Sequence, residues 1–281
     1  MKKAIYLWMM VALLSACEDG LRCEEEESGN VVLTFVTAET RATVAIGDYF
    51  GKLNVMLFDD QGQRVFDRVK TQTVTDDDFG RLSVQLSEGR YWIVAVGHSS
   101  KVSATIKSTE MVQFTASEGE KLTDTFAYCG EITVSQQPEQ HTLTMQRATA
   151  MVRVILTDIE TPDGYIRMKF DYTGGSANFN PTTMEGTTKS TQSETRQRAE
   201  EYRIYTFPYQ SATGRLKLTV SALTEAGTVI HKMVIQDVPV TRNRITTYRG
   251  KFFEDGGGEI TQSGFGFMVD AEWAGEDEHT F

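Results

Sequence analysis

The stretch RLSVQLSEGRYWIVAVGH, residues 81–98, decides the fold class of this chain. Leucine and valine alternate with polar residues over 82–86, SEG follows at 87–89, and YWIVAV at 91–96 is almost continuously apolar. Alternation with a period of two buries one face of a strand, and a three-residue loop containing glycine often closes a hairpin. We therefore predict a β-hairpin whose second strand, apolar on both faces, lies in the middle of a sandwich.

The rest of the chain repeats this strand-like pattern. Comparable stretches occupy residues 31–38, 52–67, 141–159, 164–172, 202–209, 214–223, 228–235, 245–253 and 263–273. Many short strands without long amphipathic helices predict an all-β sandwich protein. Residues 173–201 are polar and predict an extended surface loop that could hold a helical turn near its charged end. Two segments begin alike, GRLSVQL at Gly80 and GRLKLTV at Gly214, which hints at two related domains.

The N-terminal residues have the organisation of a secretory signal peptide, which we assign to residues 1–16. Two lysines precede an apolar run that is shorter than the roughly 20 residues a spanning helix needs. The sequence Leu14-Ser15-Ala16-Cys17 resembles the bacterial lipobox, which implies cleavage before Cys17 and acylation of Cys17, with palmitate as one acyl chain. Two or more acyl chains anchor a protein stably. The alternative is a plain secretory signal with an incidental cysteine.

Residues 17–30 contain four consecutive glutamates and predict a disordered acidic tether. Acidic residues soon after a lipidated cysteine resemble the export signal that places Bacteroides lipoproteins on the outer face of the outer membrane. We assign residues 31–160 to an N-terminal β-sandwich domain and residues 161–281 to a C-terminal one. The formal net charge of −11 argues against nucleic acid and anionic lipid surfaces as partners.

No set of residues predicts catalysis, a cofactor or a metal site, so we expect a protein that is not an enzyme. The four histidines are scattered, at positions 98, 141, 231 and 279. TDDDFG at residues 75–80 fits a hairpin turn better than a calcium loop. Acid pairs such as Asp59 and Asp60 occur in any acidic β protein, and therefore indicate little.

Cysteines and exposed aromatic residues leave two alternatives open. Cys23 and Cys129 could form a disulfide in an oxidising compartment, although the sequence does not require one. Tyr91 and Trp92 could stack on a sugar, but their setting favours a core strand. Trp273 is a better exposed candidate, although packing is favoured there too.

Several segments in order resemble the Bacteroides-type fimbrillins and their FimB-type fimbrial anchor relatives. They are ETRATV from Glu39, DTFAYCGEITV from Asp124, RATAMVRVIL from Arg147 and VPVTRNRITTYRGKFF from Val238. The resemblance implies two tandem transthyretin-like β-sandwich domains. The sequence departs from the family pattern at residues 127 and 129, where Ala and Cys interrupt the usual aromatic-glycine ending.

The resemblance also implies how the protein works. An arginine-specific protease would cut between Arg41 and Ala42, the strand at residues 31–38 would leave, and a strand of a neighbouring fimbrial subunit would fill the groove. Residues 263–273 are the candidate donor strand. This is β-augmentation, in which an open sheet edge gains a row of backbone hydrogen bonds. An anchor would instead keep its lipid at the base of the fibre.

Together these features predict a surface fimbrial subunit, an anchor or accessory component that serves adhesion to a host or bacterial surface ligand. The alternative is an outer-membrane surface lipoprotein that binds glycans. In both cases the lipid is the expected contact with the membrane.

Overall fold

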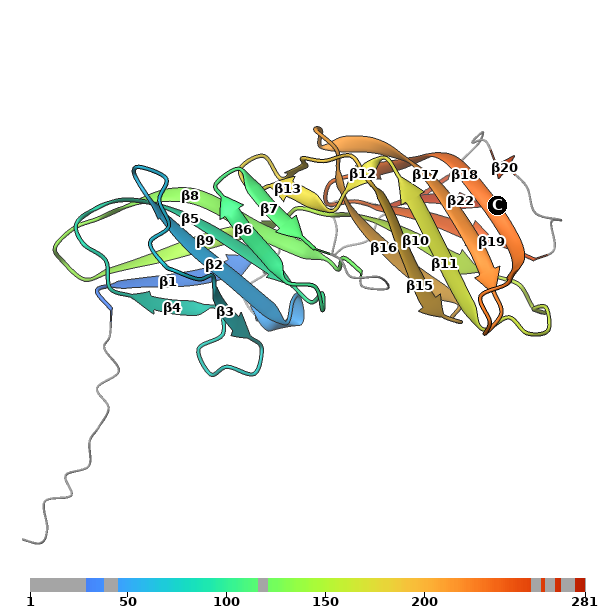
Figure 1. Ribbon diagram of the computed structural model, residues 1–281, viewed down its shortest axis with the longest axis horizontal. Coiled ribbons are helices and arrows are strands. Elements are labelled where there is room, and N and C mark those ends of the chain that lie inside the picture. The colour runs from blue at the N-terminus through green and yellow to red at the C-terminus, as the bar shows by residue number, and fades with distance from the viewer. Residues whose placement is uncertain are drawn as a thin grey trace, which may run out of the picture.

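Strands dominate the computed structural model, which describes residues 29–37, 45–115 and 121–253 together with the backbone of three short strands within 259–280 (Figure 1). The first body comprises β1 Val31–Thr37, β2 Lys52–Asp59, β3 Lys70–Thr73, β4 Arg81–Val84, β5 Gly89–His98, β6 Ala104–Ser108, β7 Met111–Phe114, β8 Thr125–Val134 and β9 Glu139–Arg147. A single 3-10 turn, η1, covers Ile46–Asp48 among the described residues. The predicted all-β class is confirmed.

The second body, which lies beside the first, begins with β10 Ala150–Leu156 (Figure 1). It continues with β11 Arg167–Thr173, β12 Gly175–Ser176, β13 Asn178–Asn180, β14 Glu185–Gly186, β15 Thr191–Gln197, β16 Glu201–Pro208, β17 Thr213–Leu223, β18 Val229–Thr241 and β19 Ile245–Gly250. The backbone of β20 Glu259–Ile260, β21 Gly266–Met268 and β22 Glu276–Thr280 completes it. No helix in the described ranges is long and apolar enough to cross a membrane.

The middle layer of the first body is formed by β3, β2, β5 and β8, in that order. One face of this layer packs on β1, β4 and β9 through Leu33, Leu53 and Ile93. The other face packs on β6 and β7 through Met56, Val94 and Val112. Burial on both faces explains why residues 91–96 are apolar throughout, as predicted.

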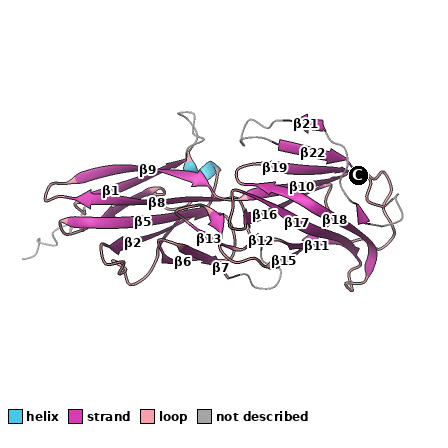
Figure 2. Cartoon of the chain, turned by 90° about the horizontal axis from the view of Figure 1, so that it is seen from above, coloured by secondary structure: helices cyan, strands magenta, loops and turns pink. Residues whose placement is uncertain are grey.

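The two bodies share one strand arrangement. Figure 2 shows them side by side, with β1, β5 and β9 in the first and β10, β17 and β19 in the second. The order β3-β2-β5-β8 in the first body matches β15-β11-β17-β18 in the second. In the first body β1 pairs antiparallel with β4 and parallel with β9. In the second, β10 pairs antiparallel with β16 and parallel with β19. The chain is therefore built on a duplicated topology, while the transthyretin-like assignment stays a prediction.

The predicted hairpin at residues 81–98 is wrong, although both of its strands exist. β4 pairs with β1, and β5 pairs with β2 and β8, so residues 85–88 connect two different layers. Residues 75–80 are likewise not a hairpin turn, because they lead from β3 to β4, which do not pair and stand at opposite ends of the strand order. A period of two fixes which face of a strand is buried but does not fix its neighbour.

Residues 173–201 are not the surface loop that we expected. They form β12, β13, β14 and β15, and they bury Phe179 and Met184. β13 pairs with β7 of the first body, where Phe179 lies opposite Val112. A sheet shared in this way joins the two bodies.

The pairing of strands changes from the first to the second body between β9 and β10. β9 pairs with β1 and β8, whereas β10 pairs with β16 and β19. A domain limit after residue 160 stays a prediction, but β10 already hydrogen-bonds with the later strands.

Candidate functional site

The first strand, β1, lies inside its layer although it is the first strand of the chain. Its seven residues pair in parallel with β9, from Val31 opposite Glu139 to Thr37 opposite Met145. Its other edge pairs antiparallel with β4. The alternate side chains Val31, Leu33 and Phe35 are almost fully buried in the core of the first body. β1 therefore supplies both backbone pairing and core side chains to a layer formed otherwise by later segments.

Asn30 fixes the start of β1. Its Nδ2 donates to the carbonyl oxygen of Leu86 at 2.8 Å, and its Oδ1 accepts from the backbone N–H of Leu86 at 2.8 Å. Farther along β1, the backbone N–H of Phe35 donates to the carbonyl oxygen of Gly80 at 2.8 Å. These contacts hold β1 against β4 and the residues next to it.

The sequence-predicted modification sites lie outside the described residues. Cys17 precedes residue 29, and Arg41 and Ala42 fall within residues 38–44. The described structure ends at Thr37 and resumes at Ala45. Lipidation and proteolytic processing therefore stay predictions. Cys23 also lies outside the described residues, so its pairing with Cys129 stays an open alternative.

A buried polar network lies where the two bodies meet. Arg147 Nε, at the end of β9, donates to Asp124 Oδ1 and Oδ2, each at 2.9 Å. Arg147 Nη1 donates to Asn243 Oδ1 in the turn between β18 and β19, also at 2.9 Å. Thr149 Oγ1 donates to Asp124 Oδ1 at 3.0 Å, and the backbone N–H of Asn243 donates to the Thr149 carbonyl at 2.9 Å.

The Arg147 side chain is only 2% exposed, and its guanidinium lies over the Phe126 ring, 4.6 Å from the centroid. Burial raises the pKa of the Asp124 carboxyl, while the adjacent Arg147 charge opposes that rise. A buried ion pair resists disruption because removing one partner leaves the other charge without compensation. We therefore assign this network the role of fixing the junction between the bodies.

The network unites three segments that carried the family resemblance. Asp124 begins DTFAYCGEITV, Arg147 begins RATAMVRVIL, and Asn243 lies in VPVTRNRITTYRGKFF. The motifs marked these residues, but no sequence pattern indicated that they contact one another.

The other sequence candidates have structural roles. His98 is fully buried, with Nε2 2.8 Å from Asn54 Oδ1, and burial followed by the Lys52 charge lowers its pKa to about 4. Asp59 Oδ1 accepts backbone N–H bonds from Gln61 and Gln63, and so stabilises a turn.

The candidate aromatic and cysteine residues pack within the fold where they are described. Tyr91 and Trp92 pack against core clusters. Cys129 is half-buried and accepts a hydrogen bond from Thr182 Oγ1 at 3.3 Å. Trp273 lies outside the described residues. Within the described part of the chain, no group of three or more His, Cys, Asp or Glu is placed to hold a metal ion.

The fold and junction define an all-β protein of two topologically matched bodies. The model of a family of unknown function, DUF6562, matches residues 104–280. Because this match covers more than half of the chain, the chain belongs to that family. None of the curated proteins compared with the sequence matches it.

Solved structures of fimbrial and adhesin proteins resemble the chain. A candidate adhesin from Bacteroides ovatus is 12% identical, covers 83% of this chain and 93% of its own, and has a TM-score of 0.49. The fimbrial anchor protein Mfa2 from Porphyromonas gingivalis is 14% identical, covers 72% and 80%, and has a TM-score of 0.42. A fimbrial assembly protein from Parabacteroides distasonis is 15% identical, covers 78% and 89%, and has a TM-score of 0.42. The predicted resemblance is confirmed as a distant likeness that carries no functional argument.

Proposed function

We propose that the chain is a non-enzymatic lipoprotein on the cell surface, a fimbrial subunit that joins its neighbours by strand exchange and serves adhesion. An anchor or accessory position suits the acidic tether behind Cys17. The observation that carries this proposal is the position of β1, which is inside a layer yet directly precedes the segment containing Arg41.

Loss of β1 would create a binding groove. It would remove Val31, Leu33 and Phe35 from the core, and each buried side chain of this size contributes about 1.5–3 kcal/mol. It would also leave β9 and β4 with unpaired backbone along the vacated space. An edge of this kind, with alternate apolar pockets, is what an incoming strand fills in β-augmentation.

The C-terminal segment is the candidate donor strand. β22 pairs in parallel with β19, which occupies the position in the second body that β9 occupies in the first. β1 also pairs in parallel with β9. A strand of a neighbouring subunit that replaced β1 would run parallel to β9. The donor segment at residues 263–273 contains β21, which pairs antiparallel with β22 at the edge of its sheet and would leave this pairing on donation.

Controlled cleavage tests strand exchange. The purified mature chain is treated with an arginine-specific protease, and an Arg41→Lys variant serves as the matched control because that protease does not cut after lysine. We expect the wild-type chain to lose β1 and form a ladder of detergent-resistant oligomers, while Arg41→Lys stays monomeric. A chain that is cut at Arg41, loses β1 and still stays monomeric would exclude the mechanism.

Mass spectrometry of the mature N terminus tests the anchor position. An acylated Cys17 as the first residue supports an anchor that keeps its lipid, whereas Ala42 as the first residue supports a polymerising subunit. A Cys17→Ser variant should lose acylation and leave the membrane fraction. Retention of that variant in the membrane fraction would contradict the lipid anchor.

A further inference from the structure

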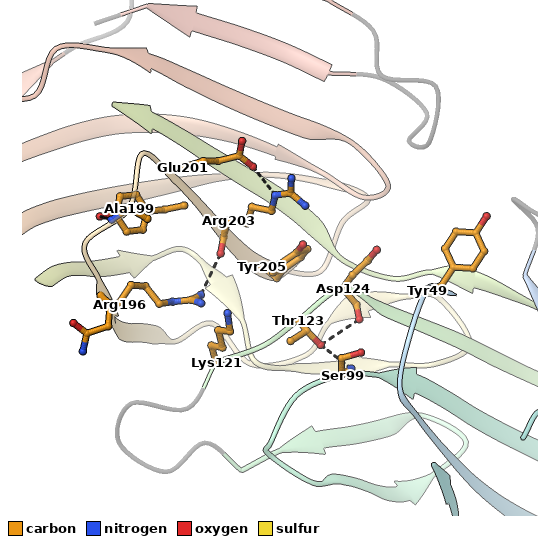
Figure 3. A pocket seen from close by; sticks show the side chains of 12 residues that line it. Tyr49, Ser99, Lys121, Thr123, Asp124, Arg196, Ala199, Glu201, Arg203 and Tyr205 are labelled. Carbon is orange, nitrogen blue, oxygen red and sulfur yellow. Dashed lines mark hydrogen bonds and ion pairs between the residues drawn. The ribbon is translucent and has the colours of Figure 1, made fainter. Parts of the chain in front are cut away.

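A second feature at the junction is a cleft of about 600 Å3 between the bodies (Figure 3). The first body lines it with Tyr49, Ser99, Lys121, Thr123 and Asp124, and the second body lines it with residues of β15, β16 and their connection. Clefts of this size between structural units are common sites for small ligands. Because both bodies contribute walls, the Arg147 network holds the cleft in shape.

The carboxylates around the cleft are already engaged. Asp124 accepts hydrogen bonds from Arg147 and Thr149. Glu201 Oε1 accepts from Arg203 Nε at 2.6 Å, and Glu194 forms an ion pair with Arg196 just behind the wall. These carboxylates therefore have cationic partners within the protein.

The cations are less fully engaged. Lys121 is exposed, and its ammonium group has no hydrogen-bond partner among the described residues. Arg196 is bound by Glu194 through Nη2, which also donates to the Arg203 carbonyl oxygen at 3.2 Å, while its Nε is buried and lacks a partner within that described set. Burial and the neighbouring Arg196 charge lower the pKa of Lys121, which Glu194 partly offsets. Glu194 offsets one of these two positive charges, and an anionic ligand group beside Lys121 would offset the other.

Aromatic and hydroxyl groups complete the cleft. Tyr205 is half-buried in the wall, and burial raises its pKa to about 12, so its hydroxyl keeps its proton at neutral pH. Tyr49 lies at the opposite end from Arg196, with Ser99 and Thr123 toward it (Figure 3). Aromatic faces beside hydroxyl groups suit a ligand with apolar faces and several hydroxyls, which describes a sugar ring.

We propose that this cleft binds an acidic saccharide, with Lys121 and Arg196 contacting its anionic group and Tyr205 packing on a sugar ring. The overall charge of −11 repels anions at long range, so binding depends on this local pair of cations. Carboxylate and sulfate groups offer the same chemistry to the two cations. Binding at this cleft requires no strand exchange, so it can be tested independently of fibre assembly.

Calorimetric titration of the full mature chain tests the site with three probes. These are oligogalacturonate, which carries carboxylates, a heparin-derived oligosaccharide, which carries sulfates, and a neutral galacto-oligosaccharide of similar length. We expect binding of at least one acidic probe, weaker binding at higher salt, and no comparable binding of the neutral probe. The acidic probe that binds identifies the anionic group.

Lys121→Gln should weaken binding of that acidic probe by about tenfold or more, since charge-assisted hydrogen bonds are worth about 1.5–3 kcal/mol. Lys121 is exposed and has no hydrogen-bond partner among the described residues, so the variant should keep its melting temperature. Lys101→Gln is the matched control, because Lys101 is an exposed lysine of the same body that does not line the cleft. Equal binding of the neutral probe, no binding of either acidic probe, or equal affinity of Lys121→Gln and wild type would each overturn the proposal.

Discussion

Arg147 and Asn243 are 96 residues apart in the sequence, yet Arg147 Nη1 donates a hydrogen bond to Asn243 Oδ1 at 2.9 Å. Arg147 belongs to the last strand of the first body, and Asn243 to a turn of the second. The same guanidinium also pairs with Asp124, so one side chain connects the end of β9, the start of β8 and the second body. This buried cation therefore helps to fix the relative position of the two bodies, together with the pairing of β13 with β7.

Replacing this cation should be strongly destabilising. Arg147→Met keeps much of the side-chain volume but leaves the Asp124 carboxylate without its partner, and we expect a loss of about 3–5 kcal/mol in the free energy of unfolding. Arg90→Met is the control, because Arg90 forms an exposed pair with Glu131 at 3.9 Å and should contribute at most about 1 kcal/mol. Urea unfolding measures both variants, and similar losses in the two would refute a special role for Arg147.

The buried His98 predicts a dependence of stability on pH. Asn54 Nδ2 donates to Thr71, so Asn54 Oδ1 faces His98 and accepts a hydrogen bond from His98 Nε2–H. The neutral form of the imidazole ring satisfies this contact. Because the folded pKa of about 4 lies below the ordinary value of 6.5, the unfolded state binds the proton first. Stability from this residue is therefore complete above pH 6.5 and falls as the pH drops to 4, by a total on the order of 3 kcal/mol.

Histidine titration by NMR checks this prediction directly. The ring signals of His98 should titrate near pH 4 in the folded protein, with unfolding monitored in parallel. A midpoint near 6.5 while the protein remains folded would contradict it.

Two glycines of the second body, Gly174 and Gly227, predict a sharp contrast between two substitutions. Gly174 has φ +120°, and a Cβ there would lie 2.3 Å from the Arg215 carbonyl oxygen, which belongs to the backbone and cannot easily move. Gly227 has φ +87° and no atom within 4 Å of its added Cβ. Gly227→Ala should thus cost only the left-handed backbone penalty of about 1–2 kcal/mol.

Gly174→Ala should cost clearly more, about 3 kcal/mol or above, since steric overlap adds to that penalty. Thermal unfolding of the two variants compares sites within the same body. Equal shifts in melting temperature would show that the backbone penalty alone operates and that the close approach to Arg215 is unimportant.

Residues 173–201 are polar and contain few apolar residues, which is why their sequence predicts a loop. Glycine and polar residues usually mark turns, but here Gly174 and Gly186 allow backbones to approach closely, and Gly175 leaves room for the Thr206 side chain. The few apolar residues, Phe179 among them, pack against segments from the other body. Because their partners lie far away in sequence, no local periodicity could reveal them.

Strand positions were predictable, whereas strand partners were not. Residues 91–96 were correctly placed in a middle layer, because a strand packed on both faces must be apolar on both. The prediction of a hairpin at residues 81–98 is wrong, because the alternation of apolar and polar residues is the same whichever strand pairs with it. The similar segments at Gly80 and Gly214 suggest a duplication, but the first contains β4 and the second lies in β17, which are not equivalent in the duplicated strand order.

For the functional residues, too, the sequence could predict positions but not contacts. Asp124, Arg147 and Asn243 lay inside recognised motifs, so their importance was foreseeable but their mutual contact was not. No sequence pattern indicated Lys121, Arg196 or Tyr205, because the cleft that they line exists only where the two bodies meet.

The shared strand β13 predicts that the two bodies unfold together. Phe179 is fully buried, stacks on Phe207 of the second body with ring centroids 4.4 Å apart, and packs in the same core cluster as Val112 of the first. Phe179→Ala should remove about 3–5 kcal/mol and weaken the coupling, because the lost contacts belong to both bodies. Differential scanning calorimetry should then resolve two transitions where the wild-type chain gives one.

Phe170→Ala is the matched control, because Phe170 is equally buried but packs only within the core cluster of the second body. Its loss is expected to destabilise that body and leave the link through β13 intact, so any separation of transitions should be smaller than in Phe179→Ala. Two transitions already present in the wild-type chain, or the same profile for both variants, would mean that β13 does not couple the bodies.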